Sequence, residues 1–248
     1  MPTPMVRKLR HGAELSEADE QALFQACATV KEVPARANLI QEGDRPHEVH
    51  VVLEGFACRF KMLPDGGRQI MAWLVPGDFC DLHVAILGEM DHNIGTLTPS
   101  RIGAIPRDQV ERLSSTSPQL SRALWWATLV DEAILREWLV AMGRRPAERQ
   151  IAHLFCELLA RLEAVGASDG RSVELPVTQT DLADTVGLSS VHVNRVLQQL
   201  RAEELIEWRE KTLTILDRPR LEALAEFNPN YLHYIRRRPE VVSGRRQA

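Results

Sequence analysis

The sequence predicts an α+β protein with an N-terminal β-roll, a long helix and a C-terminal winged helix-turn-helix. Residues 38–106 hold short runs rich in Val, Ile and aromatic residues, separated by Gly and Asp-Gly turns. The stretch that follows, between residues 118 and 143, has a helical period and no interior Gly or Pro. Residues 178–201 then have the spacing of two short helices joined by a tight turn. A chain of 248 residues suits two domains.

The first predicted domain spans residues 1–117. Ser16 with Asp19 three positions later is typical of a capped helix start, so we expect a short helix between Ser16 and Ala28. The strand-like runs that follow are "NLIQEGD", "VHVVLEGFACRFKML", "RQIMAWLVPGD" and "NIGTLTPSRIGAIP". Several short strands at this spacing predict a sandwich or a barrel-like roll.

The long helix is predicted over residues 118–143. Its positions with 4-3 spacing, which is typical of a coiled-coil seam, are Leu120, Leu124, Ala127, Asp131, Ile134, Trp138 and Ala141. Packing of this seam on the helix's own domain remains an alternative to packing on a partner. Because Leu129, Val130, Leu135, Leu139 and Val140 make other faces apolar too, we expect burial on two sides and hence a homodimer.

Residues 144–227 are predicted to form the second domain. Pro146 favours a helix start, and the helix carries an apolar face that includes Ile151, Leu154, Phe155, Leu158, Leu159 and Leu162. In "VTQTDLADTVGLSSVHVNRVLQQLRAEELI", Thr178 and Ser189 are candidate helix caps, and Gly187 supplies a left-handed turn. The alternating "LIEWREKTLTIL" predicts a two-stranded wing.

The second helix of this motif, residues 189–201, is the predicted recognition helix. Its core face is Val193, Val196, Leu197 and Leu200, so the outward side chains should be Ser190, Val191, Asn194 and Arg195. Arg can bond guanine, Asn can bond adenine and Val can contact a thymine methyl group. The candidates for phosphate contacts are Thr178, Thr180, Ser189 and His192.

Charge does not by itself indicate a nucleic-acid binder, because the net charge is −4. Within residues 176–217, four cations face seven acidic residues, so a helix-turn-helix that serves only in packing remains an alternative. DNA affinity would need help from Arg144, Arg145, Arg149 and a basic C-terminal tail, residues 228–248. That tail also fits a merely solvated charged segment.

Several classes of protein are not indicated. No apolar run approaches the roughly 18–20 residues that span a bilayer, and the N-terminus lacks a signal-peptide core, so we expect a cytoplasmic protein without a membrane partner. The four cysteines have no metal-site or disulfide spacing, and we expect most of them to be buried apolar residues.

The order of roll, long helix and winged helix, with Gly43, Gly55 and Gly77 at roll turns and "GDF" before residues 76–95, resembles a known family. This is the cyclic-AMP receptor protein and fumarate-nitrate regulator family of bacterial transcription factors. The resemblance extends to about Phe227. It implies a cyclic-nucleotide-binding-like roll, a homodimer, binding to an inverted-repeat operator in double-stranded DNA, and contact with RNA polymerase, here through residues 165–171.

The sequence departs from the family at the positions that bind the cyclic nucleotide. Cyclic-nucleotide binders use a Gly-Glu-Leu turn followed by Arg-Ser, and the corresponding positions here read Asp81-Leu82-His83 and His92-Asn93. The arginine for the phosphate and the carboxylate for the ribose are both missing, and Asp81 places a negative charge at the anion position. We therefore expect a pocket at Asp81, Leu82, His83, His92 and Asn93 for a signal other than cyclic AMP.

The family's other cofactors find little support. An N-terminal iron-sulfur cluster needs several cysteines, and this N-terminus offers only Cys27. Cys80 and His83 stand near the haem ligands of the carbon-monoxide-sensing branch, but a buried Cys80 and a hydrogen-bonded His83 are the simpler interpretation. The recognition helix also departs from the family, because Val191 replaces a common Glu while Arg195 is kept.

Two alternatives to a ligand-responsive regulator remain open. One is an enzyme on a barrel with His50, His83 and His92 as metal ligands near Asp81 and Asp91. The other is a ligand-free roll that acts as a dimer scaffold or an interaction platform. The Gly143-Arg144-Arg145-Pro146 break between two apolar helices further suggests a hinge for reorienting the winged helices.

Overall fold

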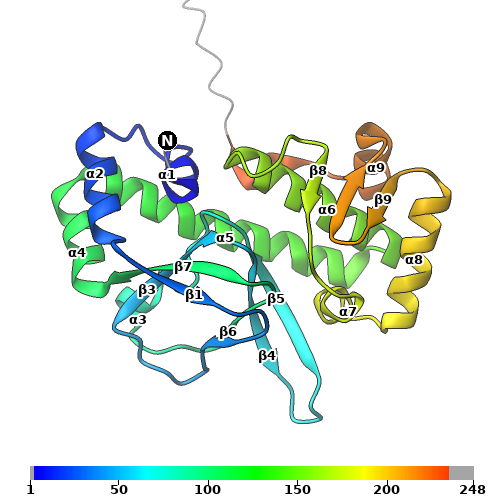
Figure 1. Ribbon diagram of the computed structural model, residues 1–248, viewed down its shortest axis with the longest axis horizontal. Helices are drawn as coiled ribbons and strands as arrows, with labels where there is room; N and C mark the ends of the chain where they lie inside the picture. The colour runs from blue at the N-terminus through cyan, green and yellow to red at the C-terminus, as the bar shows by residue number, and fades with distance from the viewer. Residues whose placement is uncertain (1–2, 235–248) are drawn as a thin grey trace, which may run out of the picture.

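The computed structural model describes residues 3–234, and every structural statement below concerns that part of the chain (Figure 1). The roll lies on the left of Figure 1 and the C-terminal domain on the right, and the long helix α5, Pro118–Arg144, runs from one to the other. In the described residues, no helix is long and apolar enough to cross a membrane. The predicted order of roll, long helix and winged helix is confirmed.

The roll is built from two antiparallel sheets. The three-stranded sheet has the order β1-β7-β3 and contains Thr29–Val33, Ser100–Pro106 and Glu48–Glu54. The four-stranded sheet has the order β2-β6-β4-β5 and contains Asn38–Ile40, Asn93–Thr96, Ala57–Met62 and Arg68–Leu74. Gly55 makes the turn between β3 and β4 at φ +81°, where a Cβ atom would lie 2.5 Å from the carbonyl oxygen of Pro99.

Every predicted strand run contains at least one observed strand, and the short helix after Ser16 is α2, Glu17–Ala26, with the Ser16–Asp19 capping box. Sequence reasoning missed β1 and the short helices α1 (Pro4–Leu9), α3 (Val84–Leu87) and α4 (Arg107–Thr116). These helices cover the roll and are short, so their periodicity gives little signal.

The long helix has two different apolar faces. The predicted coiled-coil seam packs on its own chain, since Leu120, Ala127 and Ile134 are at most 4 % exposed. The second face carries side chains with at least half of their surface exposed: Trp125, Leu129, Leu135, Leu139 and Val140. The seam of α5 therefore packs on its own chain, which was the alternative to packing on a partner. The second apolar face of α5 stays exposed.

The C-terminal domain begins at α6, Ala147–Ala164, whose apolar face is buried as predicted. Pro146 is the N-cap of this helix and not part of its first turn, as its extended backbone shows. The domain continues with α7 (Gln179–Val186), α8 (Ser190–Ala202), α9 (Arg218–Ala225) and a 3-10 turn at Pro229–Leu232. The wing pairs β9 (Ile206–Arg209) with β10 (Thr212–Ile215), and β8 (Ser172–Glu174) adds a third strand that was not predicted.

A buried cluster of four charges joins the two domains. Asp78 of the roll accepts hydrogen bonds from Lys8 of α1 and Arg161 of α6, each at 2.5 Å. Arg161 also bonds Glu157 at 2.9 Å, and all four side chains are at most 2 % exposed. Burial alone would raise the pKa of Asp78, but the two cations hold it below its usual value. Two positive and two negative groups make the cluster neutral, which is the condition for burying ions.

Candidate nucleic-acid interface and sensor cavity

The helix-turn-helix is fixed by local capping. The Thr178 hydroxyl accepts from the Asp181 amide at 3.1 Å, and Asp181 Oδ2 accepts from the Thr178 amide at 2.9 Å, which is a capping box. Gly187 ends α7 in the left-handed region at φ +67°, and the Ser189 hydroxyl accepts from the His192 amide at 3.2 Å. All three roles were predicted from the sequence, because each depends on a few neighbouring residues.

The outer face of α8 presents both an apolar and a cationic side chain to solvent. Val191 is 81 % exposed, and Ser190 and Arg195 are exposed beside it. Among the described residues, the Arg195 guanidinium has no ion pair or hydrogen bond, so its donors are available to a ligand. In Figure 1, α8 lies at the right-hand edge of the molecule.

Asn194 was expected to point outward from α8, but its side chain is not free. Its amide is half-buried and donates to Gln179 Oε1 at 3.0 Å. Gln179, at the first position of α7, was not among the predicted site residues. Its position directly after the predicted cap Thr178 was the sequence feature that could have indicated it. The pair connects the two helices, so Asn194 positions α8 as well as facing the surface.

The four candidates for phosphate contacts lie in different settings. Thr180 and Ser189 are exposed at the starts of α7 and α8. Thr178 donates its hydroxyl proton to Asp181, and His192 is half-buried. The helix N-termini still offer amides to an anion.

The auxiliary cations expected from the sequence are mostly neutralised within the chain. Arg145 bonds Glu137, and Arg149 bonds Glu226. Arg144 is exposed without an ion pair among the described residues. The predicted tail, 228–248, lies largely outside the described residues, which end at Tyr234.

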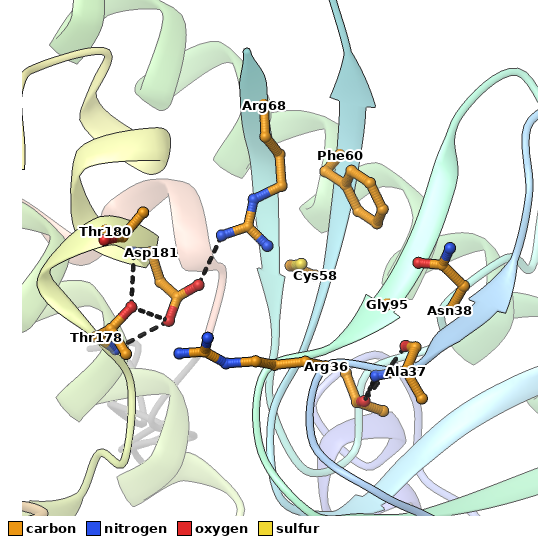
Figure 2. Close-up of a pocket in the computed structure, with 11 residues that line it drawn as sticks. Arg36, Ala37, Asn38, Cys58, Phe60, Arg68, Gly95, Thr178, Thr180 and Asp181 are labelled. Carbon is orange, nitrogen blue, oxygen red and sulfur yellow. Dashed lines mark hydrogen bonds and ion pairs between the residues drawn. The ribbon is translucent and has the colours of Figure 1, made fainter. Parts of the chain in front are cut away.

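The first helix of the motif is attached to the roll. Arg68 of β5 donates to Asp181 and Asp184 at 2.7 Å each, and Trp73 Nε1 donates to the Thr185 hydroxyl at 2.8 Å. Figure 2 shows Arg68 reaching toward Asp181 from the roll, with Arg36 below it. Arg36, Arg68 and Asp181 line a cavity of about 400 Å³ between the two domains. The roll thereby sets the position of α7, which no local sequence pattern predicted.

A second cavity, of about 370 Å³, lies between the roll and α5. It is lined by three of the five predicted pocket residues, Leu82, His83 and His92. The other two were predicted wrongly. Asp81 is fully buried in the roll, where it bonds the backbone amide and ring of His50 at 2.6 and 2.8 Å. Asn93 is turned toward β4 and bonds the Phe60 carbonyl and the Glu42 amide.

Several charged residues that line this sensor cavity were not predicted to do so, among them Arg59 and Asp131. Arg59 of β4 donates to the carbonyl oxygens of Phe79 and Cys80 and to Asp131 of α5, at 2.7–2.9 Å. Asp131 is the one acidic residue in an otherwise apolar seam. That feature of the sequence could have indicated a buried cation beside the helix. The other cations of the lining, Lys8 and Arg161, bond Asp78. All three cations are therefore neutralised by the chain itself.

The histidines and the cysteine of this region are uncharged. Burial, together with nearby Arg59, lowers the pKa of both His83 and His92. Burial also raises the pKa of the Cys80 thiol, which is buried as expected. The expectation of a hydrogen-bonded His83 is wrong, because its buried Nε2 atom has no partner.

Comparisons with known proteins agree with this architecture. Residues 30–117 match a model of the cyclic nucleotide-binding domain, and residues 149–224 match a Crp-like helix-turn-helix domain. The transcriptional activatory protein AadR of Rhodopseudomonas palustris is 30% identical over 228 residues, which cover 89% of this chain and 90% of that protein. The chain belongs to the CRP/FNR family of transcriptional regulators.

Other members of the CRP/FNR family are also similar. The nitrogen fixation regulation protein FixK of Bradyrhizobium diazoefficiens is 32% identical over 189 residues, which are 75% of this chain and 78% of that protein. The solved structure of FixK2 from Bradyrhizobium japonicum has a TM-score of 0.71 at 23% identity and covers 79% of this chain and 96% of that one. As a member of this family, the chain is placed among DNA-binding transcriptional regulators.

Proposed function

We propose that this CRP/FNR regulator acts as a homodimer that binds an inverted-repeat operator, with α8 of each chain in one major groove. The observation that carries the proposal is the outer face of α8, where Val191 and Arg195 are exposed and Arg195 is unpaired among the described residues. Arg195 reads a guanine through two hydrogen bonds, and Val191 contacts a thymine methyl group. Ser190 and Asn194 flank these contacts, and Thr178, Thr180, Ser189 and His192 approach phosphates.

The dimer is proposed to form along the exposed face of α5. Trp125, Leu129 and Leu139 are 53–68 % exposed on a helix whose opposite face is buried in its own chain. Such a stripe on one helix is typical of an interface between like helices. Two chains joined along α5 would present two recognition helices, which matches a two-fold operator.

The remaining roles come from family membership. Residues 165–171 are the proposed contact with RNA polymerase, and Gly166, Ala167, Asp169 and Arg171 of this loop are exposed. AadR is named a transcriptional activatory protein, which supports activation as the direction of regulation here. The roll is the proposed sensor of a signal other than cyclic AMP, because every cation lining its cavity is already paired within the chain.

The test is selective DNA binding by purified protein. Fragmented genomic DNA is offered at low and moderate salt, with and without cyclic AMP, and bound fragments are sequenced. We expect an enriched inverted repeat, salt-sensitive affinity and no effect of the nucleotide. Arg195→Ala should weaken operator binding by about 10-fold or more, whereas Arg112→Ala, on the roll, should not. No enriched sequence, or equal binding by Arg195→Ala, would contradict the proposal.

A further inference from the structure

Two imidazoles, of His83 and His92, face each other in the sensor cavity, and each has one ring nitrogen without a hydrogen-bond partner among the described residues. The rings of His83 and His92 have centroids 5.4 Å apart, and both line the cavity. The Nε2 atom of each is buried and unpartnered. A polar atom left unsatisfied inside a protein costs free energy, so two such atoms at one place indicate a ligand.

A carboxylate completes the group. One ligand atom each from His83, Asp91 and His92 lie within 4.8 Å of one another, which is close enough to share one ion. Asp91 Oδ1 lies 2.5 Å from His92 Nδ1. A proton held on Nδ1 leaves the lone pair of His92 on Nε2, the arrangement that orients histidines at metal sites. A carboxylate has two oxygens, so Asp91 can hold His92 with one and offer the other to an ion.

We propose that His83, Asp91 and His92 form a binding site for a divalent first-row transition-metal ion in the sensor cavity. Two imidazole nitrogens and one carboxylate suit ions such as Zn²⁺, Co²⁺ and Fe²⁺, and do not suit Ca²⁺ or Mg²⁺, which prefer several oxygen ligands. The site differs from the barrel triad considered from the sequence, because His50 is bound to Asp81 inside the roll and does not reach it.

The electrostatic setting permits a cation. Arg59 is a positive group of the lining, and its charge is balanced by Asp131 at 2.7 Å. Asp91 is exposed and contributes a negative charge to the site itself. Three protein ligands leave coordination positions that face the cavity and remain open to water or to a small molecule.

The site also lies against the helix that we assign to dimerisation. The cavity is bounded on one side by His83 and His92 and on the other by Asp131, Glu132 and Leu135 of α5. An ion that joins residue 83 to residue 92 would fix the segment that faces α5. This sensing role rests on the proposed function, whereas binding of the metal does not.

The experiment uses the full-length protein, treated with EDTA and then dialysed. Co²⁺ is added as a spectroscopic probe, and binding is followed by visible absorption and by competition with Zn²⁺. We expect one Co²⁺ per chain. His83→Ala and His92→Ala should weaken binding at least about 100-fold, and Asp91→Asn about 10-fold. The exposed His47 is the matched control, and His47→Ala should bind as the native protein does.

Two results would overturn the site. One is the absence of Co²⁺ and Zn²⁺ binding by folded native protein. The other is unchanged affinity in both His83→Ala and His92→Ala, which would mean that the ion sits on surface groups only. His83→Gln and far-UV circular dichroism guard against a misfolded variant. Operator binding measured in EDTA separates the two proposals, because a chain that binds DNA selectively but no metal refutes only this site.

Discussion

Replacing Asp78 by Asn tests the buried cluster that joins the roll to the DNA-binding domain. Asp78 is 1 % exposed and, among residues 3–234, is the only carboxylate bonded to Lys8, whereas Arg161 is also bonded to Glu157. The variant changes the cluster from neutral to a net charge of +1. It also turns an acceptor oxygen into an amide group that must face one of the cations. Removing one partner of a buried ion pair costs about 3–5 kcal/mol, a large share of the roughly 5–15 kcal/mol that stabilises a protein.

The assay is urea unfolding at pH 7, followed by fluorescence of the buried Trp73 and Trp138. We expect the free energy of unfolding to fall by about 3–5 kcal/mol in Asp78→Asn, seen as a lower midpoint. The control is Asp108→Asn, which breaks an exposed ion pair with Arg112. It should change the free energy of unfolding by less than about 1 kcal/mol.

A second substitution checks the reasoning about charge. Adding Lys8→Met to Asp78→Asn returns the cluster to neutrality, so the double variant should be more stable than Asp78→Asn alone. Two results would contradict stabilisation by charge balance. One is a loss of less than about 1 kcal/mol in the free energy of unfolding of Asp78→Asn, and the other is a further loss when Lys8→Met is added.

Three further predictions follow from single positions. Gly187→Ala should cost about 1 kcal/mol because φ is +67° there, whereas Gly143→Ala, in a helix with free space around it, should stabilise by about 0.5–1 kcal/mol. Both are measured by urea unfolding, and the hinge suggested by the sequence would be excluded if Gly143→Ala left both operator affinity and any effector response unchanged. Leu139→Asp should shift the protein from dimer to monomer in light scattering, because Leu139 is 68 % exposed on α5, while Ile86→Asp on α3 should not. Burial lowers the pKa of His153 to about 4, below the roughly 6.5 of an unfolded chain. The unfolded state therefore binds this proton first, and stability should fall as pH drops from about 6.5 to 4, less steeply in His153→Gln.

The sequence by itself determined the elements whose cause is local. The caps at Ser16, Thr178 and Ser189, the left-handed Gly187 and the core face of α8 depend on residues within one or two turns, and all were predicted. The two apolar faces of α5 were also visible in its periodicity. The periodicity did not show which of the two faces packs on its own chain. Both faces are apolar, and only the shape of the roll selects one of them.

Tertiary structure decided the charged sites. Asp81 was expected in the sensor cavity, but it is turned toward His50, whereas Arg59 of β4 lines the cavity. The bonds of Arg68 to Asp181 and of Lys8 to Asp78 span more than 60 residues of sequence. Such pairs form because burying an unpaired charge is costly, and the partner is whichever opposite charge the fold brings within reach. Local sequence therefore specified the proposed recognition helix, and long-range packing specified the cavity.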